Sequence, residues 1–275
     1  MKTISGLALI LFFLQTITQA EEDWRLKKIE AYQKIHGKRD KHGNPEGREH
    51  DLGGNSKLEG NITFIFLPSD EGPMEHLNLL LMDALKKRID VDVITELPSS
   101  SERFEAAITD STQLWIWAGK REECLPPDYI EVVCEKVKKG MSVFLLADNT
   151  PYTKGVDALL NTIAEGSRIS GNYEGEQMLR RSSSGPGFDG KHPLFRGIVT
   201  LYEGVTVSSM SGPSLRTVAR STDGNPLICV AQTPPGYGRV IVTGGFTAFF
   251  DMYWDTAGTE RLALNAAAFL SGLDE

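Results

Sequence analysis

Short apolar runs alternate with amphipathic segments over the first part of the chain, and this alternation predicts an α/β fold. Four apolar runs have the length and composition of strands: residues 61–67, 91–95, 112–118 and 141–147. Apolar residues at helical spacing predict a helix after each run, at residues 73–85, 101–109, 128–139 and 156–164. Continuously apolar strands separated by helices are typical of a parallel sheet that is covered on both faces. We therefore expect right-handed crossovers and a doubly wound sheet.

The pattern changes after residue 164. Residues 165–191 are rich in Gly and Ser and predict a long loop, of a kind that is usually functional or disordered. Shorter strands and a final helix are expected at residues 205–209, 216–220, 226–232, 239–244 and 259–270. The last two strands flank Pro234-Pro235-Gly236 and predict an antiparallel hairpin. The complete prediction is a three-layer, flavodoxin-like α/β fold with a mostly parallel sheet, helices on both faces and a C-terminal antiparallel hairpin extension.

The first twenty residues have the pattern of a secretory signal peptide. An apolar core, Leu7 to Leu14, follows Lys2, and Thr18-Gln19-Ala20 supplies the small residues that precede a cleavage site. This core is shorter than the roughly 20 residues that span a bilayer, although a retained membrane anchor is the alternative. We expect the mature chain to be secreted, into the extracellular space or the periplasm. Residues 21–60 are expected to form a charged helix and a flexible polar linker, and residues 61–275 to form the α/β domain.

The composition excludes some partners without identifying one. The formal net charge of −8 disfavours nucleic acid and anionic membrane surfaces. The three cysteines have neither the number of a disulfide framework nor the spacing of zinc ligands. Cys229 lies in an apolar run and is expected to be buried, whereas a bridge between Cys124 and Cys134 is left open. The sequence therefore predicts no cofactor, no metal ion and no membrane contact once the signal peptide is removed.

Polar residues directly follow the fourth strand and the last strand, at the edge where ligands of parallel α/β proteins bind. Asp148-Asn149-Thr150 ends the run 141–147, and Asp251 follows the last strand with Tyr253 and Trp254 close behind. Such side chains can orient a small molecule, or they can cap turns and helices by bonding to the backbone. His192 is included because the long loop can fold over this edge. The candidate ligand-binding residues are Asp70, Asp148, Asn149, Thr150, Phe246, Thr247, Asp251 and His192.

The C-terminal part of the chain resembles a known family. Residues 238–270 (GRVIVTGGFTAFFDMYWDTAGTERLALNAAAFL) are similar to the last strand, acidic loop and terminal helix of class I glutamine amidotransferase-like domains. HPLFRG, from His192 to Gly197, matches a phrase common in the non-amidotransferase branch, which includes trehalose-utilisation-type proteins and exported relatives. Together with the order of elements, the resemblance covers about residues 61–272 and implies the same α/β fold.

The chain departs from this family at the catalytic positions. In amidotransferases a Gly-x-Cys-x-Gly turn after the fourth strand supplies the nucleophile, but the corresponding position here falls near Asp148-Asn149-Thr150. The histidine that should follow the last strand is also absent, because residues 244–251 read GGFTAFFD. Neither Asn nor Thr replaces a thiolate without an adjacent base, so we do not expect glutamine hydrolysis.

Three functions are consistent with the sequence. The first is an exported, non-catalytic domain that binds a small polar or carbohydrate ligand, or a protein partner, at the carboxyl edge of the sheet. The second is a hydrolase that uses carboxylates around a water molecule or a divalent cation in the same crevice. The third is a structural module that its N-terminal segment tethers to an assembly.

Overall fold

The computed structural model describes residues 24–28, 31, 37–68, 77–120 and 125–274. The chain divides into two compact units, Met1–Glu46 and Gly47–Glu275. In the first unit, Asp40 Oδ1 closes a tight turn by accepting hydrogen bonds from the backbone N–H groups of His42 and Asn44, at 2.8 and 2.9 Å. All of the labelled helices and strands that follow belong to the second unit.

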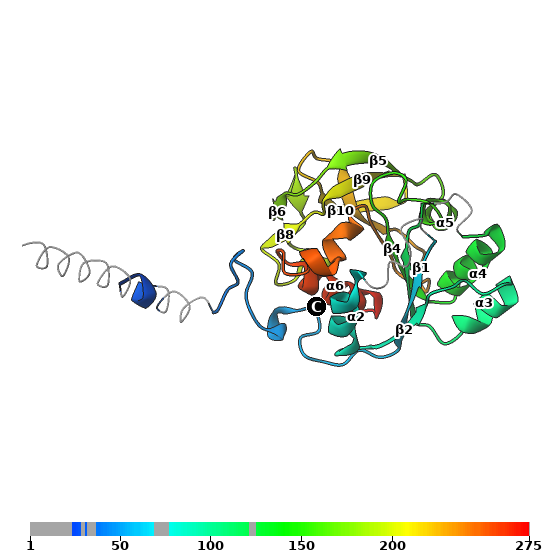
Figure 1. Ribbon diagram of the computed structural model, residues 1–275, viewed down its shortest axis with the longest axis horizontal. Coiled ribbons are helices and arrows are strands. Elements are labelled where there is room, and N and C mark those ends of the chain that lie inside the picture. The colour runs from blue at the N-terminus through cyan, green and yellow to red at the C-terminus, as the bar shows by residue number, and fades with distance from the viewer. Residues whose placement is uncertain (1–23, 29–30, 32–36, 69–76, 121–124, 275) are drawn as a thin grey trace, which may run out of the picture. The chain divides into compact units, whose positions relative to one another are not determined.

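The second unit is built on an eight-stranded sheet in the order β2-β1-β3-β4-β12-β11-β10-β7 (Figure 1). The first five strands in this order run parallel: β2 (Asp90–Ile94), β1 (Asn61–Phe66), β3 (Gln113–Trp117), β4 (Ser142–Leu146) and β12 (Val240–Thr243). The last three are antiparallel to their neighbours: β11 (Pro226–Ala231), β10 (Leu215–Arg220) and β7 (Gly187–Phe188). The mostly parallel sheet and its antiparallel C-terminal hairpin are confirmed.

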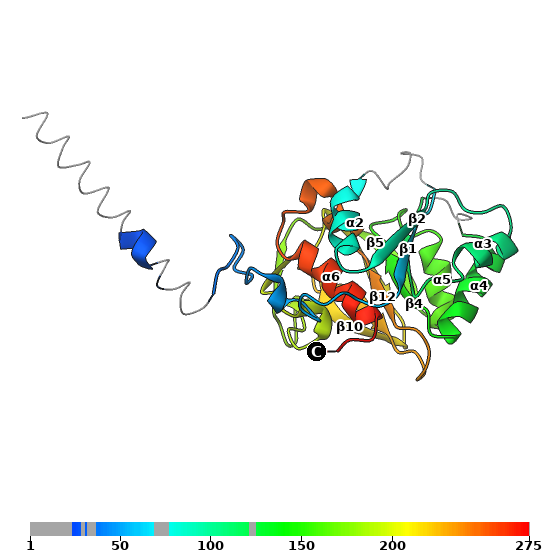
Figure 2. The ribbon, with the colours of Figure 1, turned by 90° about the horizontal axis from the view of Figure 1, so that it is seen from below.

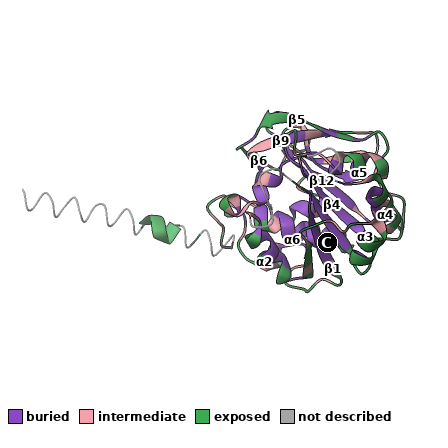
Figure 3. Cartoon of the chain, turned by 45° about the vertical axis from the view of Figure 1, so that its right-hand side comes forward, coloured by how far each residue is buried: buried purple, intermediate pink, exposed green. Residues whose placement is uncertain are grey.

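Helices cover both faces of this sheet, as Figure 2 shows. One face carries α3 (Ser101–Ala107), α4 (Pro127–Lys138) and α5 (Val156–Ile163), and the other carries α2 (Leu79–Lys86) and α6 (Thr259–Leu270). Because both faces are covered, β1, β3, β4 and β12 are buried at nearly every position. Figure 3 shows β1, β4 and β12 in purple. Trp115 and Trp117 of β3 are fully buried within this core.

The segment expected to be a long loop, residues 165–191, contains three strands, so that expectation is wrong. β5 (Arg168–Glu174) pairs antiparallel with β9 (Thr206–Ser211), and β6 (Met178–Arg180) pairs antiparallel with β8 (Thr200–Tyr202). The third strand, β7, joins the edge of the main sheet. Most side chains of β5 are exposed, so the segment lacks the alternation of apolar and polar residues that reveals a half-buried strand.

Residues 47–60, expected to be part of the polar linker, belong to the second unit and pack onto its α/β core. Leu52 is fully buried, and its backbone N–H donates to Asn265 Oδ1 at 2.7 Å. The Leu52 carbonyl accepts hydrogen bonds from both terminal nitrogens of the buried Arg88, each at 3.2 Å. Asp51 Oδ1 accepts from Arg261 Nε at 2.6 Å. Two isolated leucines, Leu52 and Leu58, in a polar stretch carry no periodic signal, so the sequence pattern did not reveal this docking.

Two further expectations concern cysteines and membranes. Cys229 is buried, as expected, and both Cys229 and Cys134 are free thiols, whereas Cys124 lies outside the described residues. Within the part of the chain that the structure describes, no helix combines the length and the apolar character that crossing a membrane requires.

Candidate functional site

Asp148 follows β4 at the carboxyl edge of the sheet, and its side chain is completely buried. Its Oδ1 accepts hydrogen bonds from the Asn149 backbone N–H and from Thr206 Oγ1, both at 2.8 Å. Its Oδ2 accepts from the Thr247 backbone N–H at 3.0 Å. The carboxylate therefore joins the end of β4 to the start of β9 and to the 3-10 helix η4 (Phe246–Phe249).

The surroundings of Asp148 act on its ionisation in opposite directions. Burial in a low-dielectric environment disfavours the charged form and is the larger effect. The donors from Thr247, Asn149 and Thr206 favour the charged form and offset part of this effect. The net result raises the pKa of Asp148 to about 6. Asp148 thus functions as an internal junction whose oxygens are engaged by the chain itself.

Asn149 and Thr150 lie above this junction and reach the surface. Asn149 Nδ2 donates to Asn172 Oδ1 of β5 at 3.1 Å, and Asn149 Oδ1 lies 2.9 Å from the Thr206 hydroxyl. The Thr150 backbone N–H donates to the Gly171 carbonyl at 2.8 Å. Asn172 was not among the candidates, because it belongs to the polar segment in which no strand was recognised.

Two tyrosines lie close to these asparagines along the chain. A Cβ atom added to Gly171, whose φ is +107°, would lie 2.3 Å from Tyr173 Cε2, so the Tyr173 ring lies directly against the Gly171 backbone. The Tyr173 side chain is 37% exposed. The Tyr152 backbone N–H donates to the Asn149 carbonyl at 2.7 Å, and Lys120 Nζ lies 4.8 Å from the centre of the Tyr152 ring. Tyr173 directly follows Asn172 in β5, so an amide and an aromatic residue are neighbours on this strand.

The residues after the last strand have structural contacts. Phe246 is fully buried, with its ring centre 4.9 Å from that of Trp117. Thr247 Oγ1 accepts a hydrogen bond from the Val205 backbone N–H at 2.9 Å. Asp251 Oδ1 accepts from the Leu80 backbone N–H at 2.9 Å and so caps the first turn of α2. The Asp148 and Asp251 carboxylates thus bond to different elements, and Asp70 lies outside the described residues.

His192 is not brought together with the other candidates. It is buried, its ring centre lies 5.3 Å from that of Phe269, and its Nδ1 accepts from the Leu194 backbone N–H at 3.3 Å. Phe269 precedes Leu270, whose carbonyl accepts from Ser142 Oγ at the amino end of β4. His192 therefore lies toward the opposite edge of the sheet from Asp148. Burial lowers the pKa of His192 to about 4, so its imidazole is neutral at pH 7.

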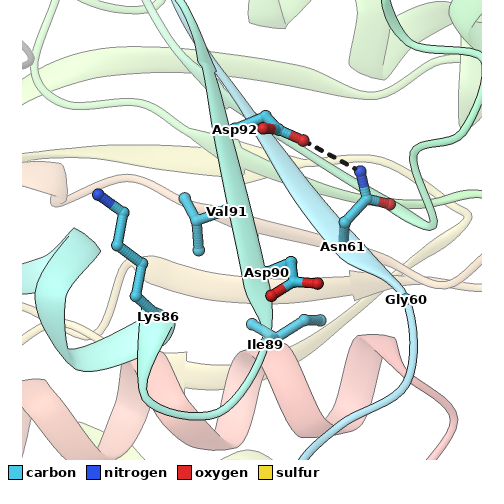
Figure 4. A pocket seen from close by; sticks show the side chains of 7 residues that line it. All are labelled: Gly60, Asn61, Lys86, Ile89, Asp90, Val91 and Asp92. Carbon is cyan, nitrogen blue, oxygen red and sulfur yellow. Dashed lines mark hydrogen bonds between the residues drawn. The ribbon is translucent and has the colours of Figure 1, made fainter.

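The amino edge of the sheet carries an open pocket of about 760 Å³ (Figure 4). It is lined by Gly60, Asn61, Lys86, Ile89, Asp90, Val91 and Asp92. Asn61 Nδ2 donates to Asp92 Oδ2 at 3.4 Å, and Asn61 Oδ1 accepts from the Thr112 backbone N–H at 3.1 Å. Across all of the described ranges, no group of three or more His, Cys, Asp and Glu side chains is placed to hold a metal ion.

Comparison with known proteins identifies the fold. No protein-family model and no curated protein sequence matches the chain. The chain is similar to the N-terminal domain of mmIFT52 at 12% identity and a TM-score of 0.63, over 78% of this chain and 99% of that one. It is also similar to a ThuA-like protein from Parabacteroides merdae at 15% identity and a TM-score of 0.50, over 78% and 91% of the two chains. Over the matched length, the chain therefore shares the fold of these two solved structures.

Proposed function

We propose that this domain is a non-catalytic binding module that holds a small carbohydrate or a related polyol at the carboxyl edge of its sheet. The observation that carries the proposal is the Asn149–Asn172 side-chain pair, with the exposed Tyr173 next to Asn172 in β5. Amide groups both donate and accept hydrogen bonds, which suits sugar hydroxyls. A tyrosine offers an apolar face with a polar tip, which suits the apolar face of a sugar ring.

The contacts of Asp148 favour binding over hydrolysis. A carboxylate that acts as a base or a nucleophile needs an oxygen directed at the substrate. Asp148 instead accepts hydrogen bonds on both oxygens from Asn149, Thr206 and Thr247. The hydrolase hypothesis also requires Asp251 to converge on the same site, whereas Asp251 bonds to the first turn of α2. These bonds leave the neutral amides and hydroxyls at this edge to contact a ligand.

A protein partner is the second candidate, and a separate observation favours it. Leu79, Leu80 and Met252 are 52%, 43% and 77% exposed. The bond from the Leu80 backbone N–H to Asp251 brings α2 and the residues around Met252 together, so these apolar side chains share one surface. Neighbouring exposed apolar side chains are typical of protein interaction sites.

The proposal also includes the compartment in which the domain acts. The pattern of residues 1–20, which lie outside the described residues, supports export of the mature chain. Export would expose the domain to extracellular or periplasmic sugars.

Calorimetric titration of the full mature chain with a panel of neutral mono- and disaccharides tests the first candidate. The variants Asn149→Ala and Asn172→Ala should each weaken the binding of a recognised sugar at least tenfold. Asn55→Ala, which removes an exposed amide elsewhere on the unit, should not change it. Absence of binding by every sugar, or equal binding by all three variants, would refute the carbohydrate site.

The second candidate needs a different readout. The mature chain is used to capture proteins from the native exported fraction. The proteins that copurify with it should no longer bind when Leu79 and Met252 are both changed to Asp. They should be retained by Asn149→Ala. A set of bound proteins that does not respond to the charged variant would place any partner elsewhere on the molecule.

A further inference from the structure

A second polar pocket, of about 510 Å³, lies where the edge strand β7 pairs with β10. One wall is formed by residues 182–191, and the other by residues 217–220 of β10. Its size falls within the usual range of small-molecule sites. We propose that this pocket binds a tetrahedral oxyanion, either a free phosphate or sulfate ion or the same group carried on a sugar ester.

Two cationic side chains line the pocket without a compensating partner. Neither Lys191 nor Arg220 forms an ion pair with any residue that the structure describes. Arg220 donates one hydrogen bond, from Nη1 to the Gly224 carbonyl at 3.1 Å, which leaves most of its five N–H groups for a ligand. Guanidinium and ammonium groups are the side chains that most often bind phosphate and sulfate.

The one carboxylate in the lining is turned toward its own loop. Asp189 Oδ1 accepts a hydrogen bond from the Lys191 backbone N–H at 3.0 Å. Two cations therefore face one carboxylate that is already partly engaged. This balance favours an anionic ligand over a cationic one.

Three consecutive serines supply further donors. Ser182 Oγ accepts from the Gly185 backbone N–H at 3.1 Å, which folds the serine turn back on itself. The hydroxyls of Ser183 and Ser184 make no hydrogen bond to any residue in the described ranges, and both side chains are exposed. They are free to donate to anionic oxygens or to the hydroxyls of an attached sugar.

The serine turn is held in place by contacts below it. The Ser182 backbone N–H donates to the Phe188 carbonyl at 2.9 Å, and Arg181 Nε donates to the Ile198 carbonyl at 3.0 Å. Gly187 has a φ of +116°, and a Cβ atom there would lie 2.1 Å from the Arg180 carbonyl oxygen. Only glycine permits this close approach, so the backbone of the serine turn is fixed before a ligand arrives. Such preorganisation lowers the entropic cost of binding.

Calorimetric titration of the mature protein with inorganic phosphate, inorganic sulfate, glucose 6-phosphate and glucose, at constant ionic strength, tests the proposal. We expect at least one of the three anions to bind and glucose to bind at least tenfold more weakly at this pocket. The double variant Lys191→Ala/Arg220→Gln should reduce anion affinity at least tenfold. If the natural ligand is a sugar ester rather than a free ion, glucose 6-phosphate should bind more tightly than either inorganic ion. The double variant Ser183→Ala/Ser184→Ala should then remove this difference in affinity.

Lys86→Ala is the matched control, because Lys86 lines the separate pocket at the amino edge of the sheet (Figure 4). It removes one positive charge and should leave anion affinity unchanged. Thermal melting of each variant establishes that it is folded. Absence of binding by every anion at millimolar concentration would overturn the proposal. Equal anion affinity of the double variant and the unmodified chain, or equal losses in the double variant and Lys86→Ala, would also overturn it.

Discussion

Because the Asp148 carboxyl group is buried, we expect its ionisation to make the free energy of unfolding depend on pH. Asp148→Asn keeps the size of the side chain and removes its ability to ionise. The amide oxygen can still accept from the Asn149 backbone N–H and from Thr206, the two donors that Oδ1 serves. The amide nitrogen would then face the Thr247 backbone N–H, which loses its acceptor. An unsatisfied donor costs about 1–3 kcal/mol, and this cost does not depend on pH.

The pH-dependent part follows from the raised pKa of Asp148. Burial raises that pKa from 3.8 to about 6, so the folded chain takes up the proton at a higher pH than the unfolded chain. The resulting stabilisation is fully present below pH 3.8 and is lost as the pH rises through 6. Since Asp148→Asn cannot take up this proton, the unmodified chain should gain stability relative to the variant as the pH falls from 7.5 to 4. The full gain is on the order of 3 kcal/mol.

Urea unfolding at pH 7.5, 6.0 and 4.5 measures this difference directly. For a domain of this size, a change of 1 kcal/mol moves the melting temperature by about 2–4 °C, so melting curves are an independent check. Asp83→Asn, at an exposed position of α2, controls for the loss of one carboxylate. A stability difference that stays constant over this pH range, or that is larger at pH 7.5 than at pH 4.5, would refute the reasoning. A constant difference would mean that the three donors balance burial, and a larger difference at pH 7.5 would mean that they outweigh it.

Three other side chains lead to predictions of their own. Burial lowers the pKa of His192 from 6.5 to about 4, so its contribution to stability is present above pH 6.5 and is lost as the pH falls through 4. In the same urea series, the unmodified chain should therefore lose stability relative to His192→Gln below pH 6.5. Asp251→Ala should destabilise the unit by about 0.5–2 kcal/mol and speed hydrogen exchange of the Leu80 amide, whereas Asp251→Asn should preserve most of the protection. Leu52→Ala should cost about 2–5 kcal/mol and make residues 47–60 sensitive to limited proteolysis; an unchanged digestion pattern would contradict their docking.

The parallel half of the fold could be predicted because its signals are local. Each of β1, β3 and β4 is a predominantly apolar run, and each is followed by residues with the spacing of a helix. A strand buried on both faces has to be apolar along its length, so the sequence pattern and the structure report the same fact. The end of such a run also marks the carboxyl edge, which is why Asp148 was identified as an edge residue.

The role of Asp148 could not be predicted in the same way. Its partners Thr206 and Thr247 are 58 and 99 residues away along the chain, and no local pattern connects them. The same limit applies to Asn172, which meets Asn149 only because β5 crosses the carboxyl edge. His192 was placed with the edge residues on the assumption of a long loop, but its packing on Phe269 puts it near the opposite edge.

By itself, the sequence determined the order of the central strands and helices along the chain, the covered sheet and the edge at which polar residues gather. These features depend on hydrophobic periodicity and residue identity, which act over a few residues at a time. Only the tertiary structure decided that polar segments such as β5 form strands, that Leu52 docks residues 47–60, and which side chains stay available to a ligand. Those outcomes depend on hydrogen bonds and burial between distant segments, which form only when the whole unit has folded.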